Sequence, residues 1–297
     1  MNKPLDSNSI YLIEPPPGEV RRKRRMGTIL AEAGRLKPCD AQRIFETQRE
    51  KGLPFGENGV RLGILQPDDV RYALSVQYGF PQGKKPGDAV SPSLVAAIAP
   101  AHPAVESIKA LRTQLVLGWL EGRECNVLSV VSAQRGDGRS FIAANLAIVF
   151  SQLNRKTLLI DMDMRHPTLH SWFGVSNASG LSDILAERNA ARALKEVDFC
   201  ENLWILTSGP TPPNPQELLS GDGMRVLMER VRAEYDVVIA DTPTSDAGAD
   251  AQLIAAHTRS AIVVSRLNHT LTRATGSLVH RLSSGGVNVL GVVATEH

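Results

Sequence analysis

Three short segments of this chain place glycines, a hydroxyl and carboxylates at spacings that suit phosphate chemistry. The first is the run at residues 132–140, Ser-Ala-Gln-Arg-Gly-Asp-Gly-Arg-Ser, which lies between two apolar segments. A strand, a glycine-rich turn and a helix N-terminus together form a phosphate-binding P-loop, because backbone N–H groups and the helix dipole both favour an anion there. Arg139 stands where this motif has a lysine. The run therefore predicts nucleotide binding and leaves turnover open.

The residue types within the run support this interpretation. Gly136 and Gly138 can adopt positive φ and let the backbone approach phosphate oxygens closely. The Ser140 hydroxyl can bind a Mg²⁺ ion that bridges the terminal phosphates. Taken alone, the run is also compatible with an ordinary glycine turn between a strand and a helix.

The other two segments are apolar runs that end in carboxylates. Residues 158–165 read Leu-Leu-Ile-Asp-Met-Asp-Met-Arg, so Asp161 and Asp163 are two residues apart and point near the same face. The second run ends at Asp241, which could hold Mg²⁺ through water. A carboxylate at a strand end can meet a terminal phosphate as metal ligand or base. Helix capping and a salt bridge with Arg165 are the structural alternative, but three such segments in this order favour chemistry.

The elements that must position these residues alternate along residues 105–297. Apolar candidate strands, with helical stretches between them, are 127–132, 157–161, 203–207, 236–241, 261–265 and 289–293. They lack polar alternation, which is typical of parallel strands covered on both faces. The pattern predicts an α/β fold with a doubly wound, mostly parallel sheet and with ligands at the carboxyl ends of the strands.

The first 104 residues have a different organisation. Residues 1–24 are expected to be a disordered, basic leader, and the proline-rich residues 81–104 a linker. Residues 25–80 hold two copies of one unit at a constant offset: Gly27, Gly34, Leu36, Asp40 and Gln48 recur as Gly56, Gly63, Leu65, Asp69 and Gln77. Each copy predicts a short helix that ends at glycine and a second helix that begins near the aspartate. A small helical repeat domain is therefore expected to precede the P-loop domain.

Composition restricts the class of protein further. The formal net charge is +2, so we expect no nucleic-acid partner, and the one dense charge run, 21–25, is typical of a solvated tail. Three scattered cysteines do not suggest a disulfide framework. Neither a membrane-spanning apolar stretch nor a signal peptide is recognisable, which predicts a cytoplasmic location.

The three segments together resemble the bacterial tyrosine kinase family, whose members act in the export and chain-length control of exopolysaccharide. That family carries a P-loop, a D-x-D-x-R motif after the next strand and a strand that ends in D-T-P. Residues 165–170 also resemble its R-x-P-x-x-H, and residues 208–219 its S-G-x-x-P-P-N-P-x-E-L-L. Residues 106–112 resemble the E-x-x-R-x-x-R helix through which family subunits assemble. The resemblance covers roughly residues 105–293.

The resemblance implies a role for each matching residue. The ATP phosphates would be bound by Gln134, Arg135, Gly136, Asp137, Gly138, Arg139, Ser140 and Phe141. Mg²⁺ would be held by Ser140, Asp161 and Asp241. Asp161, Asp163 and Arg139 would be catalytic, with the two carboxylates orienting the metal and activating a tyrosine hydroxyl. Glu106, Lys109 and Arg112 would join subunits into a homo-oligomer.

The chain also departs from the family pattern. Arginine at position 139 keeps the positive charge but fits phosphate differently from a lysine, so we expect binding to survive better than transfer. The tyrosines are Tyr11, Tyr72, Tyr78 and Tyr235, so the family's phosphorylated C-terminal tyrosine cluster is not expected. The family usually needs a membrane-embedded activator. A separate polysaccharide co-polymerase would then recruit this chain to the inner face of the membrane.

The repeat resembles the N-terminal domain of type II secretion and pilus ATPases, some of which bind cyclic di-GMP. Arg25, Gly27 and Gln48 match that pattern in the first copy, whereas the second copy lacks the arginine. A cyclic di-GMP sensor and a helical docking module are both compatible with this sequence.

Two alternatives to a tyrosine kinase stay open for the P-loop domain. A non-catalytic regulator would use ATP occupancy to control the assembly of a polysaccharide export system. A partitioning or positioning ATPase would have a similar fold, but Gln134 stands where those proteins carry an additional lysine.

Overall fold

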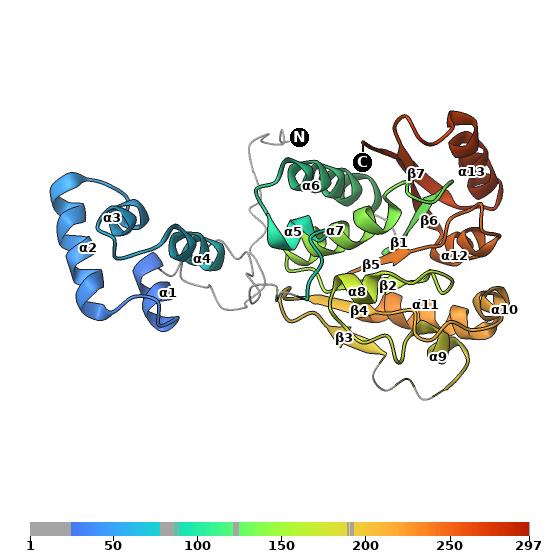
Figure 1. Ribbon diagram of the computed structural model, residues 1–297, viewed down its shortest axis with the longest axis horizontal. Coiled ribbons are helices and arrows are strands. Elements are labelled where there is room, and N and C mark those ends of the chain that lie inside the picture. Colours follow the sequence, from blue (N-terminus) through green and yellow to red (C-terminus); the bar gives the residue numbers. More distant parts are fainter. Residues whose placement is uncertain are drawn as a thin grey trace, which may run out of the picture. The chain divides into compact units, whose positions relative to one another are not determined.

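The computed structural model describes residues 25–77, 87, 89–120, 125–188, 190 and 193–296. The chain divides into two compact units, Met1–Tyr78 and Gly79–His297 (Figure 1). The expected leader, residues 1–24, lies outside the described residues. None of the helices in the described part of the chain is long and apolar enough to cross a membrane.

The N-terminal unit consists of two helix pairs, one for each copy of the repeat. The helices are α1 (Met26–Glu32), α2 (Pro38–Lys51), α3 (Phe55–Arg61) and α4 (Pro67–Gln77). Gly34 and Gly63 follow α1 and α3 with φ of 67° and 69°, a conformation that glycine adopts without strain. Leu36 and Leu65, which are equivalent in the two copies, are both buried in the small core between the pairs. The repeat in the sequence is thus a repeat of supersecondary structure.

The second unit contains a seven-stranded sheet with the order β3-β4-β2-β5-β1-β6-β7. Its strands are β1 (Val127–Ser132), β2 (Thr157–Asp161), β3 (Leu194–Glu196), β4 (Leu203–Leu206), β5 (Val237–Asp241), β6 (Ser260–Arg266) and β7 (Asn288–Thr295). Only the β3–β4 pair is antiparallel; the other pairs are parallel. The predicted α/β fold with a mostly parallel sheet is confirmed.

Helices cover both faces of this sheet (Figure 1). One face carries α5 (Val95–Ile98), α6 (Pro103–Leu115), the π-helical segment η1 (Val116–Leu120) and α7 (Arg139–Ser151). The opposite face carries α9 (Leu181–Leu185), α10 (Pro215–Ser220), α11 (Asp222–Glu234), α12 (Asp250–Thr258) and α13 (Thr272–Ser284), while the short α8 (Leu169–Trp172) follows β2. Alternate strand residues face the two cores: Leu159 packs with α7, whereas Leu158 and Ile160 pack on the other side.

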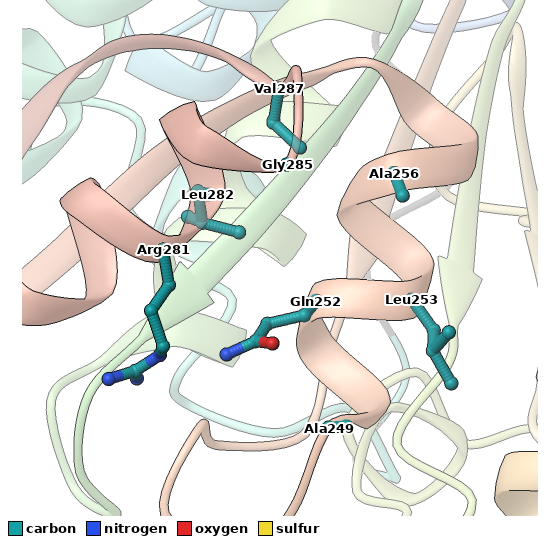
Figure 2. Close-up of a pocket in the computed structure, with 8 residues that line it drawn as sticks. All are labelled: Ala249, Gln252, Leu253, Ala256, Arg281, Leu282, Gly285 and Val287. Carbon is teal, nitrogen blue, oxygen red and sulfur yellow. The ribbon is translucent and has the colours of Figure 1, made fainter.

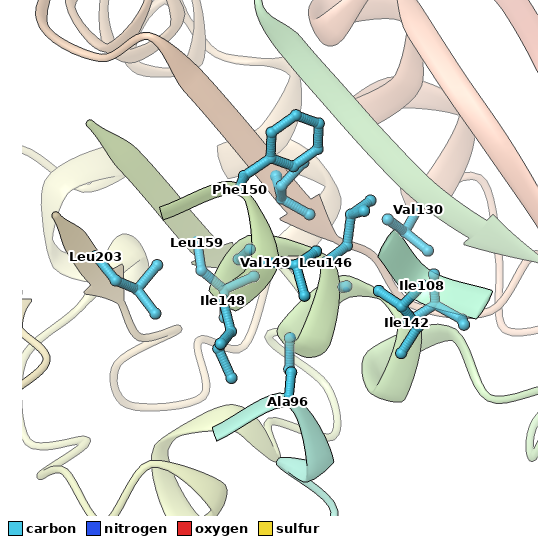
Figure 3. Packing of buried hydrophobic residues seen from close by; sticks show 14 of the residues in the cluster. Ala96, Ile108, Val130, Ile142, Leu146, Ile148, Val149, Phe150, Leu159 and Leu203 are labelled. Carbon is cyan, nitrogen blue, oxygen red and sulfur yellow. The ribbon is translucent and has the colours of Figure 1, made fainter. Parts of the chain in front are cut away.

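Helix α7 is the most deeply buried helix of the P-loop unit, because all of residues 142–151 are buried. Its side chains Leu146, Ile148 and Phe150 are fully buried among residues of the neighbouring strands and of α5 and α6 (Figure 3). A helix covered so completely holds its N-terminus in a fixed place. The P-loop therefore joins two rigid elements, β1 and α7.

The segment from residue 89 to residue 104, expected to be linker, packs on the α/β unit instead. Leu94 and Ala96 are fully buried, and the Ala96 N–H donates to the Asn145 side chain over 2.9 Å. Asn145 in turn donates to the Ser93 carbonyl over 2.9 Å. Pro103 is the first residue of α6, and the buried Leu94 and Ala96 belong to the same hydrophobic core as the side chains of α7. Residues 78–86 lie outside the described part.

Gly180 offers a test of this fold, because a side chain there would overlap the backbone of the neighbouring segment. A Cβ atom at Gly180 would collide with the Thr207 carbonyl and the Gly209 amide, and would lie 2.7 Å from the Gly209 Cα. We expect Gly180→Ala to destabilise the P-loop unit by about 3 kcal/mol or more, since neither backbone can move aside without losing its hydrogen bonds. Gly276→Ala is the matched control, because the Cβ at this position in α13 meets no atom within 4 Å.

The measurement is urea unfolding followed by tryptophan fluorescence. Trp119, Trp172 and Trp204 are the three tryptophans of the chain and all belong to the P-loop unit. Gly276→Ala should raise the stability by roughly 0.5–1 kcal/mol, the usual gain for alanine over glycine in a helix. Equal stability of Gly180→Ala and the wild type would show that the two segments do not approach as described.

Candidate nucleotide-binding site

The P-loop has the backbone conformation that its glycines predict. Gly136 and Gly138 have φ of 88° and 90°, and Gly138 is the N-cap of α7. Helix α7 then begins at Arg139 and continues for 13 residues. Because β1 ends at Ser132, residues 133–138 form a tight connection that aims a helix N-terminus toward the carboxyl ends of the strands. Such a connection is suited to an anion.

Residues far away in the sequence stabilise this loop through hydrogen bonds to Asp137. The buried Asp137 carboxylate accepts a hydrogen bond from the Gln134 N–H over 3.0 Å and another from the Thr270 hydroxyl. The Thr295 hydroxyl, at the end of β7, donates to the Asp137 carbonyl over 2.8 Å. Asp137 was predicted to bind phosphate, but its side chain is used to shape the loop. Sequence reasoning missed Thr270 and Thr295, since they lie more than 130 positions away and belong to no motif.

The three predicted carboxylates come together beside the loop. Asp161 and Asp241 are register partners at the ends of the adjacent parallel strands β2 and β5. β5 also pairs with β1, which leads into the P-loop. The exposed fractions of Asp161, Asp163 and Asp241 are 0%, 5% and 0%. Three buried carboxylates thus share one end of the sheet, where a doubly wound fold places its ligands.

Asp161 is held by backbone donors. Its carboxylate accepts hydrogen bonds from the N–H groups of Asp163 (3.2 Å), Thr168 (3.2 Å) and Leu169 (3.1 Å), which organises the turn between β2 and α8. Burial raises the pKa of Asp161 well above its usual value, and the negative charge of Asp241 raises it further. Its assignment as a catalytic residue and metal ligand stays a prediction, with a turn-organising role now added.

Arg139 is the cation of the site, and its three guanidinium nitrogens all have partners. Nε donates to Asp241 Oδ1 over 3.1 Å, Nη1 to Ser132 Oγ over 3.1 Å and Nη2 to Asp163 Oδ2 over 3.3 Å. Only 11% of its side chain is exposed. The other oxygen of Asp163 accepts hydrogen bonds from the N–H groups of Arg165 and His166. The guanidinium is therefore bound to carboxylates at the mouth of the P-loop.

Asp241 has the properties of a metal ligand. Its Oδ1 receives Arg139, whereas its fully buried Oδ2 has no hydrogen-bond partner among the described residues. Burial raises the pKa of Asp241, while the charge of Arg139 lowers it and the nearby Ser140 hydroxyl lowers it further. A buried carboxylate oxygen without a partner is costly unless a ligand completes it.

The pair of Ser140 and Asp241 therefore fits a Mg²⁺ ion that is bound together with phosphates. Within the described ranges no group of three or more His, Cys, Asp and Glu side chains could hold a metal ion by itself. Mg²⁺ in nucleotide sites needs few protein ligands, because phosphate oxygens and waters complete its octahedron. The available donors match this requirement.

The predicted assembly residues lie on α6. Lys109 pairs with Glu106 over 2.7 Å on the surface. Arg112 instead reaches the neighbouring helix, since its Nη1 donates to the Val149 carbonyl of α7 over 2.8 Å, and its buried Nε has no hydrogen-bond partner within the described ranges. Arg112 thus attaches α6 to α7, and its part in subunit assembly stays a prediction.

The three residues predicted to contact cyclic di-GMP lie in the N-terminal unit. Arg25 is exposed directly before α1, Gln48 is half-buried in α2 and Gly27 is buried in α1. A Cβ atom at Gly27 would lie 3.2 Å from the Phe55 ring of the second copy. This packing explains the glycine without a ligand, so the structure adds nothing that favours cyclic di-GMP.

A separate open pocket of about 220 Å³ lies between α12 and α13 (Figure 2). It contains none of the predicted site residues. Its lining residues are Ala249, Gln252, Leu253, Ala256, Arg281, Leu282, Gly285 and Val287.

Comparison with known proteins identifies first the class and then the family. A family model described as "ATPase MipZ" matches residues 127–273. Together with the P-loop and the parallel sheet, this match defines the class of P-loop ATPase-like proteins. Among curated proteins, the tyrosine-protein kinase YwqD of Bacillus subtilis (strain 168) is 38% identical over 171 residues, which cover 58% of this chain and 72% of that protein.

Two further relatives carry the names of kinases as well. A Klebsiella pneumoniae tyrosine-protein kinase named for its cps region is 34% identical over 249 residues, 82% of this chain and 34% of that protein. The solved kinase domain of the Escherichia coli tyrosine kinase ETK has a TM-score of 0.67 and 33% identity, and the match covers 71% of this chain and 82% of that one. The chain belongs to the bacterial tyrosine kinase family. It spans only 27% to 34% of the length of several curated relatives that it matches.

Proposed function

We propose that the P-loop unit binds Mg·ATP and transfers a phosphoryl group to tyrosine, within a system that polymerises or exports exopolysaccharide. The unpartnered Oδ2 of the buried Asp241, beside Ser140 at the start of α7, carries this proposal. Membership of the bacterial tyrosine kinase family supports the kind of reaction, and the cps region in the name of the Klebsiella relative supports the polysaccharide setting.

In this proposal each residue of the site has a separate task. The loop from Gln134 to Gly138 and the first N–H groups of α7 bind the phosphates through the backbone. Ser140 and Asp241 hold Mg²⁺, which neutralises charge on the transferring phosphoryl group when it is bound. Asp163, the most solvent-accessible of the three carboxylates at 5%, accepts the proton of the tyrosine hydroxyl. Arg139 supplies positive charge where negative charge develops.

Incubation of the full chain with labelled ATP, Mg²⁺ and a cytoplasmic fragment of a polysaccharide co-polymerase tests this function. We expect phosphotyrosine on the chain or on the fragment, formed only when ATP and Mg²⁺ are both present. Measurable ATP affinity without any phosphotyrosine would refute the kinase and leave the regulator described next.

A non-catalytic regulator is the second candidate, and the pairing of Arg139 with Asp163 favours it. Asp163 Oδ2 already accepts a hydrogen bond from the Arg139 guanidinium over 3.3 Å, so this oxygen is not free to receive a tyrosine hydroxyl. ATP occupancy would then change subunit assembly through α6 rather than phosphorylate a partner. Arg139→Lys separates the two candidates: a strong rise in phosphotyrosine would identify a weakened kinase, whereas ATP-dependent assembly without transfer in both forms would identify a regulator.

For the N-terminal unit we propose a docking module for another protein of the export system, with cyclic di-GMP as an alternative ligand. Isothermal titration of cyclic di-GMP into the full chain distinguishes the two. Heat that saturates at micromolar concentration and is lost in Arg25→Ala would support the sensor. The absence of binding heat at such concentrations would refute the cyclic di-GMP sensor.

A further inference from the structure

The ion pair between Arg139 and two carboxylates indicates a second role for this residue. The guanidinium connects Asp163 and Asp241, which come from different strand ends, while also donating to Ser132. It does so from the first residue of α7, a helix that is fixed by its own burial. The arrangement is thus a built feature of the site and not a chance surface contact.

Only an arginine can make these contacts at once. The guanidinium is a planar fork with five donors, so it can bridge two carboxylates and a hydroxyl. A lysine ammonium is a single compact charge on a side chain without such a fork. It could not contact both carboxylates and the hydroxyl in the same way. The substitution of arginine for lysine in the P-loop is therefore explained by the carboxylates beside the loop as well as by phosphate.

The charges of the site indicate that a cation would compete with Arg139 for the carboxylates. Three carboxylates are buried together, and among the described residues Arg139 is the guanidinium that donates hydrogen bonds to two of them. Asp241 keeps one buried oxygen without a partner, so negative charge remains for a further cation. A divalent cation that binds Asp241 Oδ2 would compete with the guanidinium on Oδ1 for the charge of the same carboxylate, and the two positive charges would repel each other at this distance.

We propose that Arg139 is a built-in counter-ion of Asp163 and Asp241, and that a divalent metal ion competes with it for this carboxylate pair. In the wild type the guanidinium then offsets part of the negative charge of this pair without metal, and a metal ion at Asp241 Oδ2 weakens the pairing of the guanidinium with Oδ1 through charge repulsion. Removing the guanidinium makes the carboxylates dependent on a divalent ion. The inference rests on the proposed function only in placing the metal ion at Asp241.

Thermal unfolding of the full chain without nucleotide tests this competition. Tryptophan fluorescence reports on the P-loop unit alone, because all three tryptophans belong to it. Each protein is measured in EDTA and in millimolar MgCl2 at constant ionic strength. Arg139→Met keeps a long apolar stem but removes the charge, and we expect its Tm in EDTA to fall by roughly 5–10 °C, because two buried carboxylates lose their partner.

The response to Mg²⁺ is the decisive readout. We expect Mg²⁺ to restore at least half of the loss in Arg139→Met and to change the wild-type Tm by no more than about 2 °C. Arg232→Met is the matched control, since Arg232 lies in the same unit and its guanidinium donates to a carbonyl of His257 rather than to a carboxylate. Its Tm should fall without any recovery in Mg²⁺.

Arg139→Lys keeps the inference testable if Arg139→Met does not fold. The lysine can neutralise one carboxylate at a time, so its Tm should respond to Mg²⁺ more than the wild-type Tm does. Equal responses of the wild type and the position-139 variants, or a stable Arg139→Met that ignores Mg²⁺, would overturn the inference. Because no nucleotide is present, a failure of ATP binding or transfer does not affect this result, and the two proposals fail separately.

Discussion

Replacing Asp241 with asparagine should lower phosphotyrosine formation by a factor of about 10²–10³, the usual cost of removing one electrostatic group from a preorganised site. The amide has the shape of the carboxylate but cannot hold Mg²⁺ with comparable strength, and it leaves Arg139 with one fewer anionic partner. The chain should stay folded, because the buried carboxylate already carries an unpartnered oxygen that the variant replaces with a neutral group. The assay is transfer from labelled ATP under activation by the co-polymerase fragment.

Asp246→Asn is the matched control for this prediction. Asp246 lies five positions further along the same loop after β5, and its side chain is exposed. Its removal changes the local charge by the same amount without touching the site, so transfer should stay within about twofold of the wild type. Equal transfer by Asp241→Asn and Asp246→Asn would show that Asp241 holds nothing that the reaction needs.

Gly138→Ala should weaken ATP binding by at least about tenfold, because alanine at a φ of 90° adds strain of roughly 1–3 kcal/mol to the loop. The new Cβ atom would also lie 3.3 Å from Thr295 Cγ2, which presses on the contact that fastens the loop to β7. Relief of this strain moves the first turn of α7, and the backbone N–H groups then no longer converge on phosphate. Equilibrium titration of ATP in the presence of Mg²⁺ measures the loss.

Gly286→Ala is the matched control for this prediction, because it introduces a similar backbone strain at a position outside the P-loop. Gly286 has a φ of 78° beyond the end of α13, where a Cβ atom meets no other atom within 4 Å. It should cost a similar amount of folding stability and leave ATP affinity unchanged. A similar loss of affinity in both variants would mean that Gly138 acts through general stability.

Much of the sheet could be predicted because its strands carry their own signal. The runs at β1, β2 and β5 are continuously apolar, since helices cover both of their faces, and the sequence places their ends within one residue of the structure. Strand β3 could not be found in this way. Its three residues, Leu194–Glu196, are exposed or half-buried at an edge, so neither an apolar run nor alternation marks them.

The site could be predicted as a set of strand-end residues but not as a network. Parallel strands end at one edge, so the meeting of Asp161, Asp163 and Asp241 follows from their places in the sequence. The sequence does not say which carboxylate receives backbone donors and which receives Arg139. Those partners depend on the turn after β2 and on the reach of a side chain across the loop.

The segment around Leu94 shows that amino-acid composition alone does not predict whether a segment is buried. Its prolines are typical of a linker, yet its few apolar side chains fill a surface that α7 leaves open. Burial depends on whether a complementary surface exists elsewhere in the chain, and local composition does not contain that information. The contacts of Thr270 and Thr295 with the P-loop could not be predicted from the sequence for the same reason.

Titration of ATP into the full chain in the presence of Mg²⁺ tests most directly the claim that this loop is a nucleotide phosphate site. The wild type and Gly286→Ala should each bind one ATP per chain with the same affinity, and Gly138→Ala should bind at least about tenfold more weakly. Failure of the wild type to saturate with ATP, or equal binding by all three proteins, would contradict the account.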